Sequence, residues 1–319
     1  MAGNSNLHTS QRQAQNEFYT PISMIEEELR LHKEYFKGKT VFCNADDPNI
    51  GDDGTDHFGD GQGGYTSNFW RYFQLNFEIL GLKKLIATHY DPEKPTYKVV
   101  MENGTITKTP LIQNGDFRSP ECVEILKESD VVVTNPPFSL FKEYIPFLIE
   151  HDKDFLVIGN MNDITFNGII PLVMENKVWL GYNSGHYWFR VPEYYEEKKT
   201  DFKIDETGQK WRRMGNICWY TTLDVKTRHD EYIMYKKYDP KEYKKLDTYD
   251  ALFIEKKIDI PYDYDGIMAV PITFMTEFNP SQFELLGKFD TGAVNKYNLA
   301  NPKINGKTKY KRMAIKRRN

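Results

Sequence analysis

The sequence has few cysteines and no long apolar run. Its 319 residues include three cysteines, an odd number at wide spacing, without a histidine or cysteine partner at metal-ligand separation. Neither a disulfide framework nor a structural zinc is supported, and we expect no metal. The strongly apolar runs, such as 131–133 and 155–158, are far shorter than the roughly 20 residues of a membrane helix. Residues 1–15 are polar and lack an export signal's apolar core, so we expect a cytoplasmic protein without a membrane partner.

An overall excess of basic charge is also lacking. The 42 basic and 46 acidic residues give a net charge of −4, which argues against a histone-like binder. The basic charge is concentrated at one end, because residues 291–319 contain nine Lys or Arg and no Asp or Glu. This segment could contact nucleic-acid phosphates, although a solvated basic strand explains it equally well.

Apolar and aromatic side chains are plentiful and follow alternating patterns along the chain. They make up 39% and 14% of the residues, enough for a sizeable core. Short apolar runs predict strands at 40–43, 85–88, 130–134 and 155–158. Helical spacing predicts helices at 20–36, 67–80, 119–127 and 139–150. Strands alternating with helices predict an α/β fold with a doubly wound sheet, whose ligands bind at the carboxyl ends of the strands.

Local signals predict the ends and turns of these elements. Thr20 is the expected N-cap of the first helix, with Pro21 at its first position. Alternating residues around Asn103 and Gly104 predict a β-hairpin, which we place outside the main sheet. The Asp- and Gly-rich segment 44–64 lacks the terminal Glu and the flanking helices of a calcium-binding EF-hand, so we expect a flexible loop.

One motif follows a buried strand directly. Asn135, Pro136, Pro137 and Phe138 stand immediately after the strand at 130–134. The prolines stiffen the turn and leave the Pro136 carbonyl free to accept a hydrogen bond, and the Asn135 side-chain oxygen is a second acceptor. Two acceptors on one NH2 group draw its hydrogens out of conjugation and free the nitrogen lone pair for attack. Phe138 can stack on a planar base held there. The motif indicates methyl transfer to a conjugated exocyclic amine, and the alternative is a rigid loop.

Carboxylates also stand near two other predicted elements, one before a helix and one after the first strand. Asp116 and Phe117 precede the helix that leads into the strand before Asn135, and a carboxylate there can accept the adenine amino group of a cofactor. A simple Asx-turn explains the same residues. Asn44, Asp46 and Asp47 follow the first strand, where a carboxylate can meet the methionine amino group or the ribose hydroxyls. A capped turn is the alternative there.

On these motifs, the chain resembles the EcoRI-like adenine methyltransferase family of amino-directed DNA methyltransferases. The similar stretches span most of the chain: 16–21, 43–48, 67–70, 115–117, 135–138, 219–224 and 270–274. A Phe-Tyr-Thr-Pro element precedes the first strand, cofactor elements precede the catalytic one, and extra sequence lies at the C-terminal end. This order resembles the gamma arrangement of such enzymes, in which target recognition follows the catalytic part.

The resemblance implies a Rossmann-like methyltransferase sheet, S-adenosylmethionine as cofactor and an adenine flipped out of duplex DNA as target. The cofactor-binding residues that it implies are Phe18, Tyr19, Thr20, Asn44, Asp46, Asp116, Phe117 and Asn135. The catalytic residues that it implies are Asn135, Pro136, Pro137 and Phe138. The sequence departs from the pattern in two places. It lacks a Phe-x-Gly-x-Gly turn after the first strand, and after the second strand Thr88, His89 and Tyr90 stand where an acidic residue is expected, with Asp91 late. We therefore assign no ribose ligand.

The polar segment 183–214 separates β-like runs at 178–182 and 216–223. We place DNA contacts on this insert, with Trp188 as a wedge or second aromatic and with basic residues on the phosphates: Lys198, Lys199, Arg212 and Arg213. A packed hairpin and a solvated loop are the alternatives.

These inferences combine into one prediction. Residues 1–224 form the catalytic domain and 225–319 a basic, β-rich target-recognition region of a site-specific DNA adenine N6-methyltransferase. We expect a monomer whose functional partner is a cognate restriction endonuclease, although a protective or epigenetic role stays open. The alternatives are a methyltransferase for RNA guanine N2 or protein glutamine, a non-catalytic DNA-binding module, and, as a lesser variant, cytosine N4 methylation.

Overall fold

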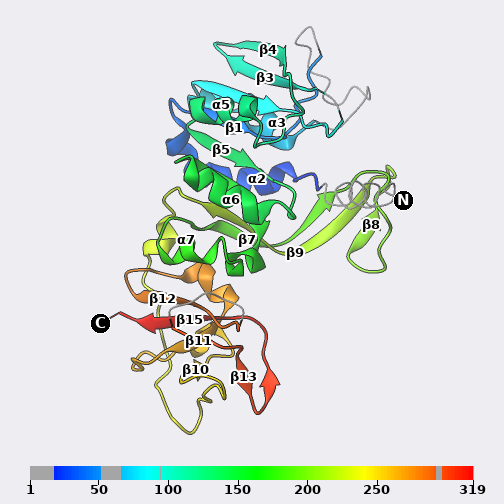
Figure 1. Cartoon of the computed structure of the whole chain (residues 1–319). Helices are drawn as coiled ribbons and strands as arrows, with labels where there is room; N and C mark the ends of the chain where they lie inside the picture. Colours follow the sequence, from blue (N-terminus) through cyan, green and yellow to red (C-terminus); the bar gives the residue numbers. More distant parts are fainter. Residues whose placement is uncertain (1–17, 52–65, 94, 292–296, 319) are drawn as a thin grey trace. The chain divides into compact units, whose positions relative to one another are not determined.

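The computed structural model describes residues 18–51, 66–93, 95–291 and 297–318 (Figure 1). The chain divides into two compact units. The first contains residues 1–160 and 183–223, and the second contains residues 161–182 and 224–319. The second unit therefore includes the segment Met161–Tyr182 in addition to the region after residue 224. The catalytic role predicted for residues 1–224 and the target-recognition role predicted for residues 225–319 remain predictions.

The first unit is built on a mixed sheet. Its parallel centre consists of β2 (Lys84–Thr88), β1 (Thr40–Cys43), β5 (Val131–Thr134) and β6 (Asp154–Asn160), in that order. These are the four strands expected from the apolar runs. Antiparallel strands extend both sides: β3 (Tyr97–Glu102) and β4 (Thr105–Pro110) beyond β2, and β9 (Lys210–Thr221) and β7 (Trp179–Arg190) beyond β6. A short β8 (Phe202–Ile204) pairs with β9.

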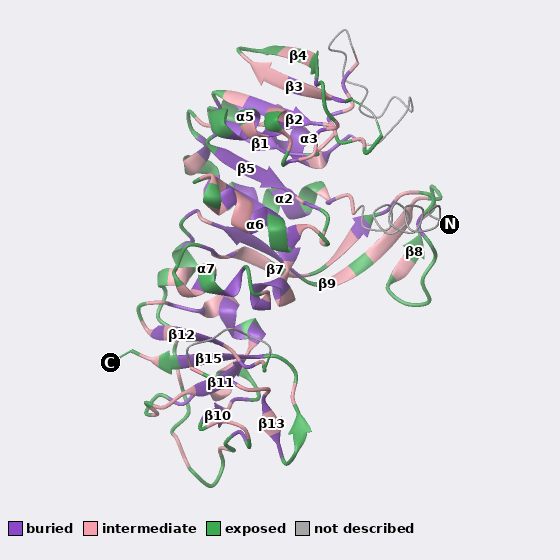
Figure 2. Cartoon of the chain, viewed as in Figure 1, coloured by how far each residue is buried: buried purple, intermediate pink, exposed green. Residues whose placement is uncertain are grey.

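Helices cover both faces of this sheet. Side chains alternate between faces along a strand, so Val41, Val131 and Leu156 join a buried cluster on one face. The elements that fill this face are α2 (Ile22–Leu29), the 3-10 helix η1 (Arg30–Phe36), α3 (Asn68–Leu75) and α4 (Phe77–Leu80). On the other face, α5 (Pro120–Glu128) packs against β1 and α6 (Phe141–Glu150) against β6. The central strands are buried except at Lys84, Asp154 and Asn160 (Figure 2), and the doubly wound α/β class is confirmed.

Three local expectations differ from the structure. Thr20 does not cap the first helix, because Pro21 is the N-cap residue and no side chain caps that end. The hairpin at Asn103 and Gly104 does form, with both residues at positive φ, but β3 pairs with β2, so the hairpin belongs to the main sheet. About half of the segment 183–214 is strand, since it contains most of β7, all of β8 and the start of β9, which agrees with the hairpin alternative rather than with a solvated loop. Most of the Asp- and Gly-rich segment 44–64, from residue 52 onward, lies outside the described residues, and so does the expectation of a flexible loop there.

The second unit is rich in short strands, as expected for the C-terminal extension. Its sheet has the order β10 (Leu252–Phe253), β11 (Met268–Pro271), β15 (Arg312–Arg317) and β12 (Phe283–Lys288). A separate pair is formed by β13 (Lys303–Ile304) and β14 (Lys307–Thr308). The remaining elements are α7 (Ile170–Met174) and the 3-10 helices η2 (Met161–Thr165), η3 (Lys226–His229), η4 (Lys257–Asp259) and η5 (Ile272–Glu277).

Several of the basic residues at the end of the chain are engaged within the protein. Arg312 is buried, and Arg317 and Arg318 donate hydrogen bonds to the backbone carbonyls of Tyr262 and Pro280. Arg317 and Arg318 thus bind backbone carbonyls near the end of β15, and Lys311, although exposed, donates to Thr165 Oγ1 at 2.9 Å. Within the described ranges, no helix is long and apolar enough to cross a membrane.

Candidate active site

A pocket of about 350 Å³ opens at the carboxyl ends of β1, β2 and β5 in the first unit. Its volume suits a small-molecule ligand. The predicted residues that line it are Phe18, Tyr19, Thr20, Asn44, Asp46, Asp116, Phe117, Asn135, Pro136 and Pro137. Further lining residues that sequence reasoning did not assign include Ser67, Asn68, Phe69, His89, Tyr90, Ser139, Leu140 and Tyr144. The positions after the strands are thus brought together, although Phe138 is not among the lining residues.

Asn135 follows the last residue of β5 and is fixed by its amide nitrogen. Its Nδ2 donates to the Phe18 carbonyl at 3.0 Å and lies 3.2 Å from the Thr20 hydroxyl oxygen. Its Oδ1 is buried and has no hydrogen-bond partner within the described part of the chain. An unsatisfied buried acceptor is costly and needs an explanation. The side chain is therefore held with an acceptor oxygen free for a ligand donor.

The segment 18–20 is held in place from three sides. The Tyr19 N–H donates to the Arg190 carbonyl of β7 at 2.9 Å, and Asn68 Nδ2 donates to the Thr20 carbonyl at 2.7 Å. Asn135 supplies the third contact. Sequence reasoning assigned Thr20 to a helix cap, whereas its hydroxyl faces Asn135. The segment that precedes α2 is thereby fixed over the end of β5.

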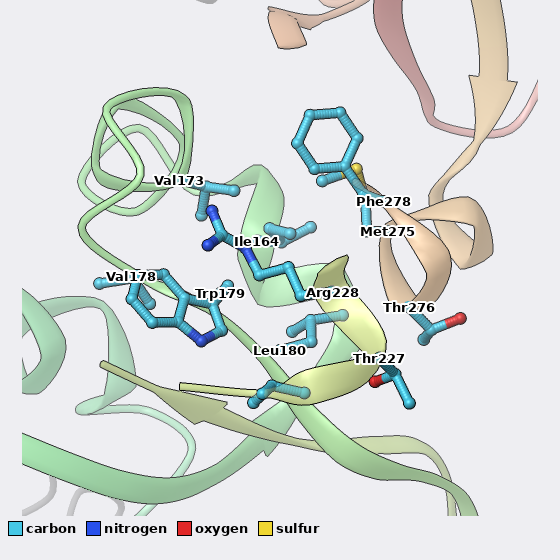
Figure 3. A pocket seen from close by; sticks show the side chains of 11 residues that line it. Ile164, Val173, Val178, Trp179, Leu180, Thr227, Arg228, Met275, Thr276 and Phe278 are labelled. Carbon is cyan, nitrogen blue, oxygen red and sulfur yellow. The ribbon is translucent and has the colours of Figure 1, made fainter. Parts of the chain in front are cut away.

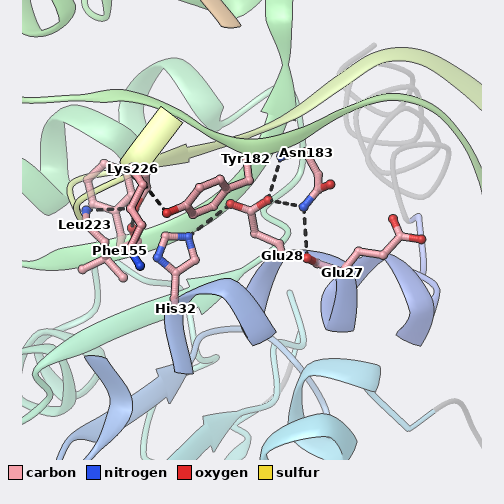
Figure 4. A network of polar contacts seen from close by, with 9 residues as sticks. Glu27, Glu28, His32, Phe155, Tyr182, Asn183, Leu223 and Lys226 are labelled. Carbon is pink, nitrogen blue, oxygen red and sulfur yellow. Dashed lines mark hydrogen bonds and ion pairs between the residues drawn. The ribbon is translucent and has the colours of Figure 1, made fainter. Parts of the chain in front are cut away.

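The α2 helix is anchored by a buried charged group (Figure 4). Glu28 Oε2 accepts from the Asn183 backbone N–H and Nδ2, both at 2.8 Å, and Glu28 Oε1 lies 3.2 Å from His32 Nε2. Asn183 Nδ2 also donates to the Glu27 carbonyl at 3.1 Å. A buried carboxylate is tolerated because these groups satisfy it. The network joins α2 to β7.

Phe138 stacks on Phe18 instead of facing the pocket. Their ring centroids are 5.6 Å apart, with 30° between the ring planes. Phe18 also makes edge contacts with Phe189 and Tyr195. Two rings at this separation leave no room for a base between them, so this face of Phe138 is available to a planar ligand only after the Phe18 ring moves.

Asp46 lies between β1 and β5. Its Oδ1 accepts from the Ser67 hydroxyl at 2.9 Å, and its Oδ2 lies 2.6 Å from the Thr134 hydroxyl oxygen. Burial raises the pKa of Asp46 to about 7, against the lowering effect of the two hydroxyl contacts. This carboxylate is held ready for a cationic ligand that would restore its charge. Both polar atoms of the Asn44 side chain are already hydrogen-bonded. Its Nδ2 donates to Thr88 Oγ1 at 3.1 Å, and its Oδ1 accepts from the Tyr144 hydroxyl.

Asp116 is already engaged by its neighbour. Arg118 donates to both carboxylate oxygens, at 2.9 and 2.8 Å, and these hydrogen bonds lower the pKa of Asp116. The Arg118 guanidinium also lies 4.8 Å from the centroid of the Phe117 ring. The carboxylate is thereby ionised and oriented at the pocket edge, with lone pairs left to accept from a ligand.

The predicted DNA contacts lie on β7, β8, β9 and their connections, outside the pocket. Lys203 Nζ stands 4.7 Å from the centroid of the Trp188 ring. Arg212 donates to the backbone carbonyls of Thr200 and Asp201, and Lys198 pairs with Glu196 at 3.2 Å. Lys199 and Arg213 are exposed, without a side-chain partner among the residues described. Phe189, next to Trp188, is fully buried, so it is a core residue.

The second unit has a much smaller pocket (Figure 3). The Arg228 guanidinium lies 4.2 Å from the centroid of the Trp179 ring, and its Nη2 donates to Asn176 Oδ1 at 2.6 Å. The enclosed space is about 20 Å³, which suits a water molecule rather than a substrate. We assign it a packing role.

Comparison with known proteins places these residues in context. Residues 6–319 match the family described as adenine-specific methyltransferase EcoRI. The chain is 43% identical to the Type II methyltransferase M.EcoRI of Escherichia coli, over 99% of this chain and 97% of that protein. It is 37% identical to the Type II methyltransferase M.MpnI of Mycoplasma pneumoniae and 36% identical to M.MgeORF184P of Mycoplasma genitalium, each over 95% of both chains. No significant match is found among solved structures.

Proposed function

Because the chain belongs to the EcoRI family of adenine-specific methyltransferases, we propose that it transfers a methyl group from S-adenosylmethionine to the exocyclic amine of an adenine flipped out of duplex DNA. The similarity extends over nearly the whole of this chain and of relatives named as Type II methyltransferases. Because the aligned region spans nearly the whole chain, it contains the residues that line the pocket.

The observation that carries the proposal is the free Oδ1 of Asn135. The amide nitrogen is held by Phe18 and Thr20, so the side chain cannot turn its oxygen away without losing these contacts. In the complex, Oδ1 and the Pro136 carbonyl accept the two hydrogens of the adenine amine. The nitrogen lone pair is then available for attack, and the proton leaves after the methyl group arrives. This chemistry requires neither a metal nor a strong general base.

The pocket fits the donor that this reaction needs. S-adenosylmethionine supplies an electrophilic methyl group on a sulfonium. The described residues offer a carboxylate for its ammonium group, Asp46, and another for its adenine amine, Asp116, with Phe117 against the ring. In this proposal the segment 18–20 would cover the methionine end of the cofactor, while Asn44 donates to Thr88 at the end of β2. The free acceptor of Asn135 would then lie at the border between cofactor and target.

The test is a product analysis with three substrates in parallel. The purified protein is incubated with labelled S-adenosylmethionine and unmethylated plasmid DNA, total RNA or protein extract, and the products are digested. We expect label in N6-methyladenine from DNA. Label confined to RNA guanine or protein glutamine would replace this proposal with the corresponding alternative, and label in N4-methylcytosine would change the target base. Failure to bind S-adenosylmethionine in calorimetry would point to a non-catalytic DNA-binding module, whereas cofactor binding without label anywhere would point to a missing partner or an untested substrate.

Binding of S-adenosylmethionine should weaken as the pH falls through about 7, because Asp46 then takes up a proton and loses the charge that attracts the ammonium group. The affinity should fall by up to about tenfold per pH unit below that value. An Asp46→Asn variant should bind more weakly near neutral pH and lose this part of the dependence. Titration calorimetry between about pH 6 and pH 8 measures both proteins. If the affinities of the unaltered protein and of the Asp46→Asn variant changed with pH in the same way, the role of Asp46 would be contradicted.

We also propose that the β7, β8 and β9 region binds DNA phosphates through its exposed cations. Arg213→Ala should weaken binding to all duplexes alike and reduce the slope of log affinity against log salt by about one. Arg213→Lys is the matched control, because it preserves the charge and should preserve the slope. Fluorescence anisotropy over a salt series measures both variants. An unchanged slope for the alanine variant would remove Arg213 from the interface.

Three further proposals concern the oligomeric state, the functional partner and the part of the chain that recognises DNA. We propose that the enzyme acts as a monomer, since one methylation event on a duplex needs a single active site. We also propose that it protects a short DNA site from a cognate restriction endonuclease, a functional partner suggested by the Type II names of its relatives. The region after residue 224 is proposed to recognise the target, and Trp188 to contact DNA near the flipped base.

A further inference from the structure

The end of β2 carries no carboxylate, although cofactor ribose is expected to lie there in the proposed reaction. The residues that follow β2 and line the pocket are His89 and Tyr90. Asp91 comes next, but it is not among the lining residues, and its Oδ1 accepts from the Glu93 backbone N–H. The described pocket carboxylates are Asp46, Asp47 and Asp116. Among the described residues, the candidates for a ribose-binding carboxylate therefore lie at the other strand ends.

The two consecutive aspartates after β1 make contacts on different sides of the pocket. Asp46 meets Thr134 at the end of β5. Asp47 makes its contact on the other side of β1, toward β2 and β3, because its Oδ1 accepts from the hydroxyl of Tyr97, the first residue of β3, at 2.5 Å. Its Oδ2 lies 3.9 Å from Nε2 of His89, which follows β2. The Asp47 carboxylate therefore stands at the edge where β2 ends.

The surroundings of Asp47 fix its orientation and leave one oxygen available. Oδ1 also accepts from the Asn49 backbone N–H at 2.9 Å, so this oxygen has two donors. His89 is itself fixed, with Nδ1 2.7 Å from Thr96 Oγ1 and its ring stacked on Tyr97. The His89 contact at 3.9 Å is too long for a hydrogen bond, and Oδ2 accepts none from the described residues. The side chain is one-third exposed, at the pocket.

We propose that Asp47 binds the ribose hydroxyls of the cofactor, in place of the acidic residue that β2 lacks. The inference rests on the proposed function, because it concerns the same cofactor in the same pocket. A carboxylate is acceptor-only when ionised, and a ribose diol presents two O–H donors, so the two groups match. Hydrogen bonds to an ionised acceptor are the stronger kind. Tyr97 and His89 act as positioning residues for the carboxylate.

The test replaces Asp47 by asparagine and measures selectivity for ribose. Asn retains an acceptor oxygen for Tyr97 and Asn49, so the loop should keep its conformation, but an NH2 group takes the place of Oδ2. Affinity for S-adenosylmethionine, measured by titration calorimetry, should fall by about 10- to 100-fold. Asp91→Asn is the matched control, because it removes a nearby carboxylate outside the pocket, and its affinity should be unchanged.

A second measurement separates ribose recognition from a general effect of charge. The probes are 5′-methylthioadenosine and its 2′,3′-dideoxy counterpart, each used to displace the cofactor. The unaltered protein should prefer the ribose compound by about 10-fold or more, and the Asp47→Asn variant should bind the two almost equally. A preference of unchanged size in the variant, or none in the unaltered protein, would overturn the inference. Failure of the unaltered protein to bind S-adenosylmethionine would instead show that the proposed function itself is wrong.

Discussion

Replacement of Asn135 by alanine should slow methyl transfer by at least about 10²- to 10³-fold, the cost found when one preorganised hydrogen-bonding group is removed from an active site. The alanine side chain has no acceptor for the adenine amine, so nothing at this position draws its hydrogens out of conjugation. The contact to the Phe18 carbonyl is lost as well, but the Tyr19 and Asn68 contacts still hold the segment. Single-turnover transfer of labelled methyl groups to duplex DNA measures the rate.

Two further measurements show whether the loss lies in the chemical step. Affinity for S-adenosylmethionine should stay within about threefold of the unaltered protein, because neutral hydrogen bonds at the edge of a site contribute modestly. Asn135→Asp keeps an acceptor oxygen but not the donor to Phe18, so it should retain more activity than the alanine variant. An alanine variant within tenfold of full activity would show that Asn135 does not have the assigned role.

Gly115→Ala should destabilise the first unit by more than about 3 kcal/mol and abolish cofactor binding, because two penalties add at this position. Gly115 has φ +78°, a conformation that costs an L-residue roughly 1–2 kcal/mol. A Cβ there would also stand 2.1 Å from the His89 carbonyl oxygen. The His89 carbonyl is a backbone group, and the Thr96 Cγ2 atom would also stand 2.9 Å away, so relief requires the end of β2 to move away from Asp116. Urea unfolding followed by tryptophan fluorescence gives the free energy of unfolding.

The hairpin turn provides the matched comparison. Gly104 has φ +74°, but an added Cβ would meet nothing within 4 Å. Gly104→Ala should therefore show only the backbone penalty, roughly 1–2 kcal/mol, and leave cofactor affinity unchanged. The difference between the two variants measures the close approach of Gly115 to His89. Equal free energies of unfolding would mean that the backbone around Gly115 yields easily, contrary to this expectation.

Elements defined by local signals were predictable from the sequence. Ser119 and Pro120 begin α5 as expected, with the Ser119 hydroxyl accepting from the Cys122 N–H. The Asn103 and Gly104 turn is likewise encoded locally, since both residues adopt positive φ readily. The attachment of that hairpin to β2 was not predictable, because strand partners are chosen by pairing across the sheet. The full length of β7 and β9 was not predictable either, because the polar sequence of their outer portions resembles that of a loop.

The candidate site was predictable to the extent that strand ends define it. Residues after β1 and β5 were expected to meet, and Asp46 and Asn135 do line one pocket. The contacts that decide what each side chain can do were not predictable. Tyr97 is 50 residues from Asp47 in the sequence, and Phe18 is 117 residues from Asn135. Which groups are already engaged depends on such distant partners, and no spacing rule identifies them.

The second unit consists of two separate stretches of the chain, and this limits how the protein can be divided. The stretch Met161–Tyr182 contains α7, which packs against β12, and Asn162, which accepts from the Tyr310 hydroxyl. A fragment ending at residue 224 would keep this stretch but lose those partners, and would expose buried Val173 and Ile170. Such a fragment should aggregate. Exchange of recognition regions between relatives, by recombination or by design, would therefore need to carry both stretches together.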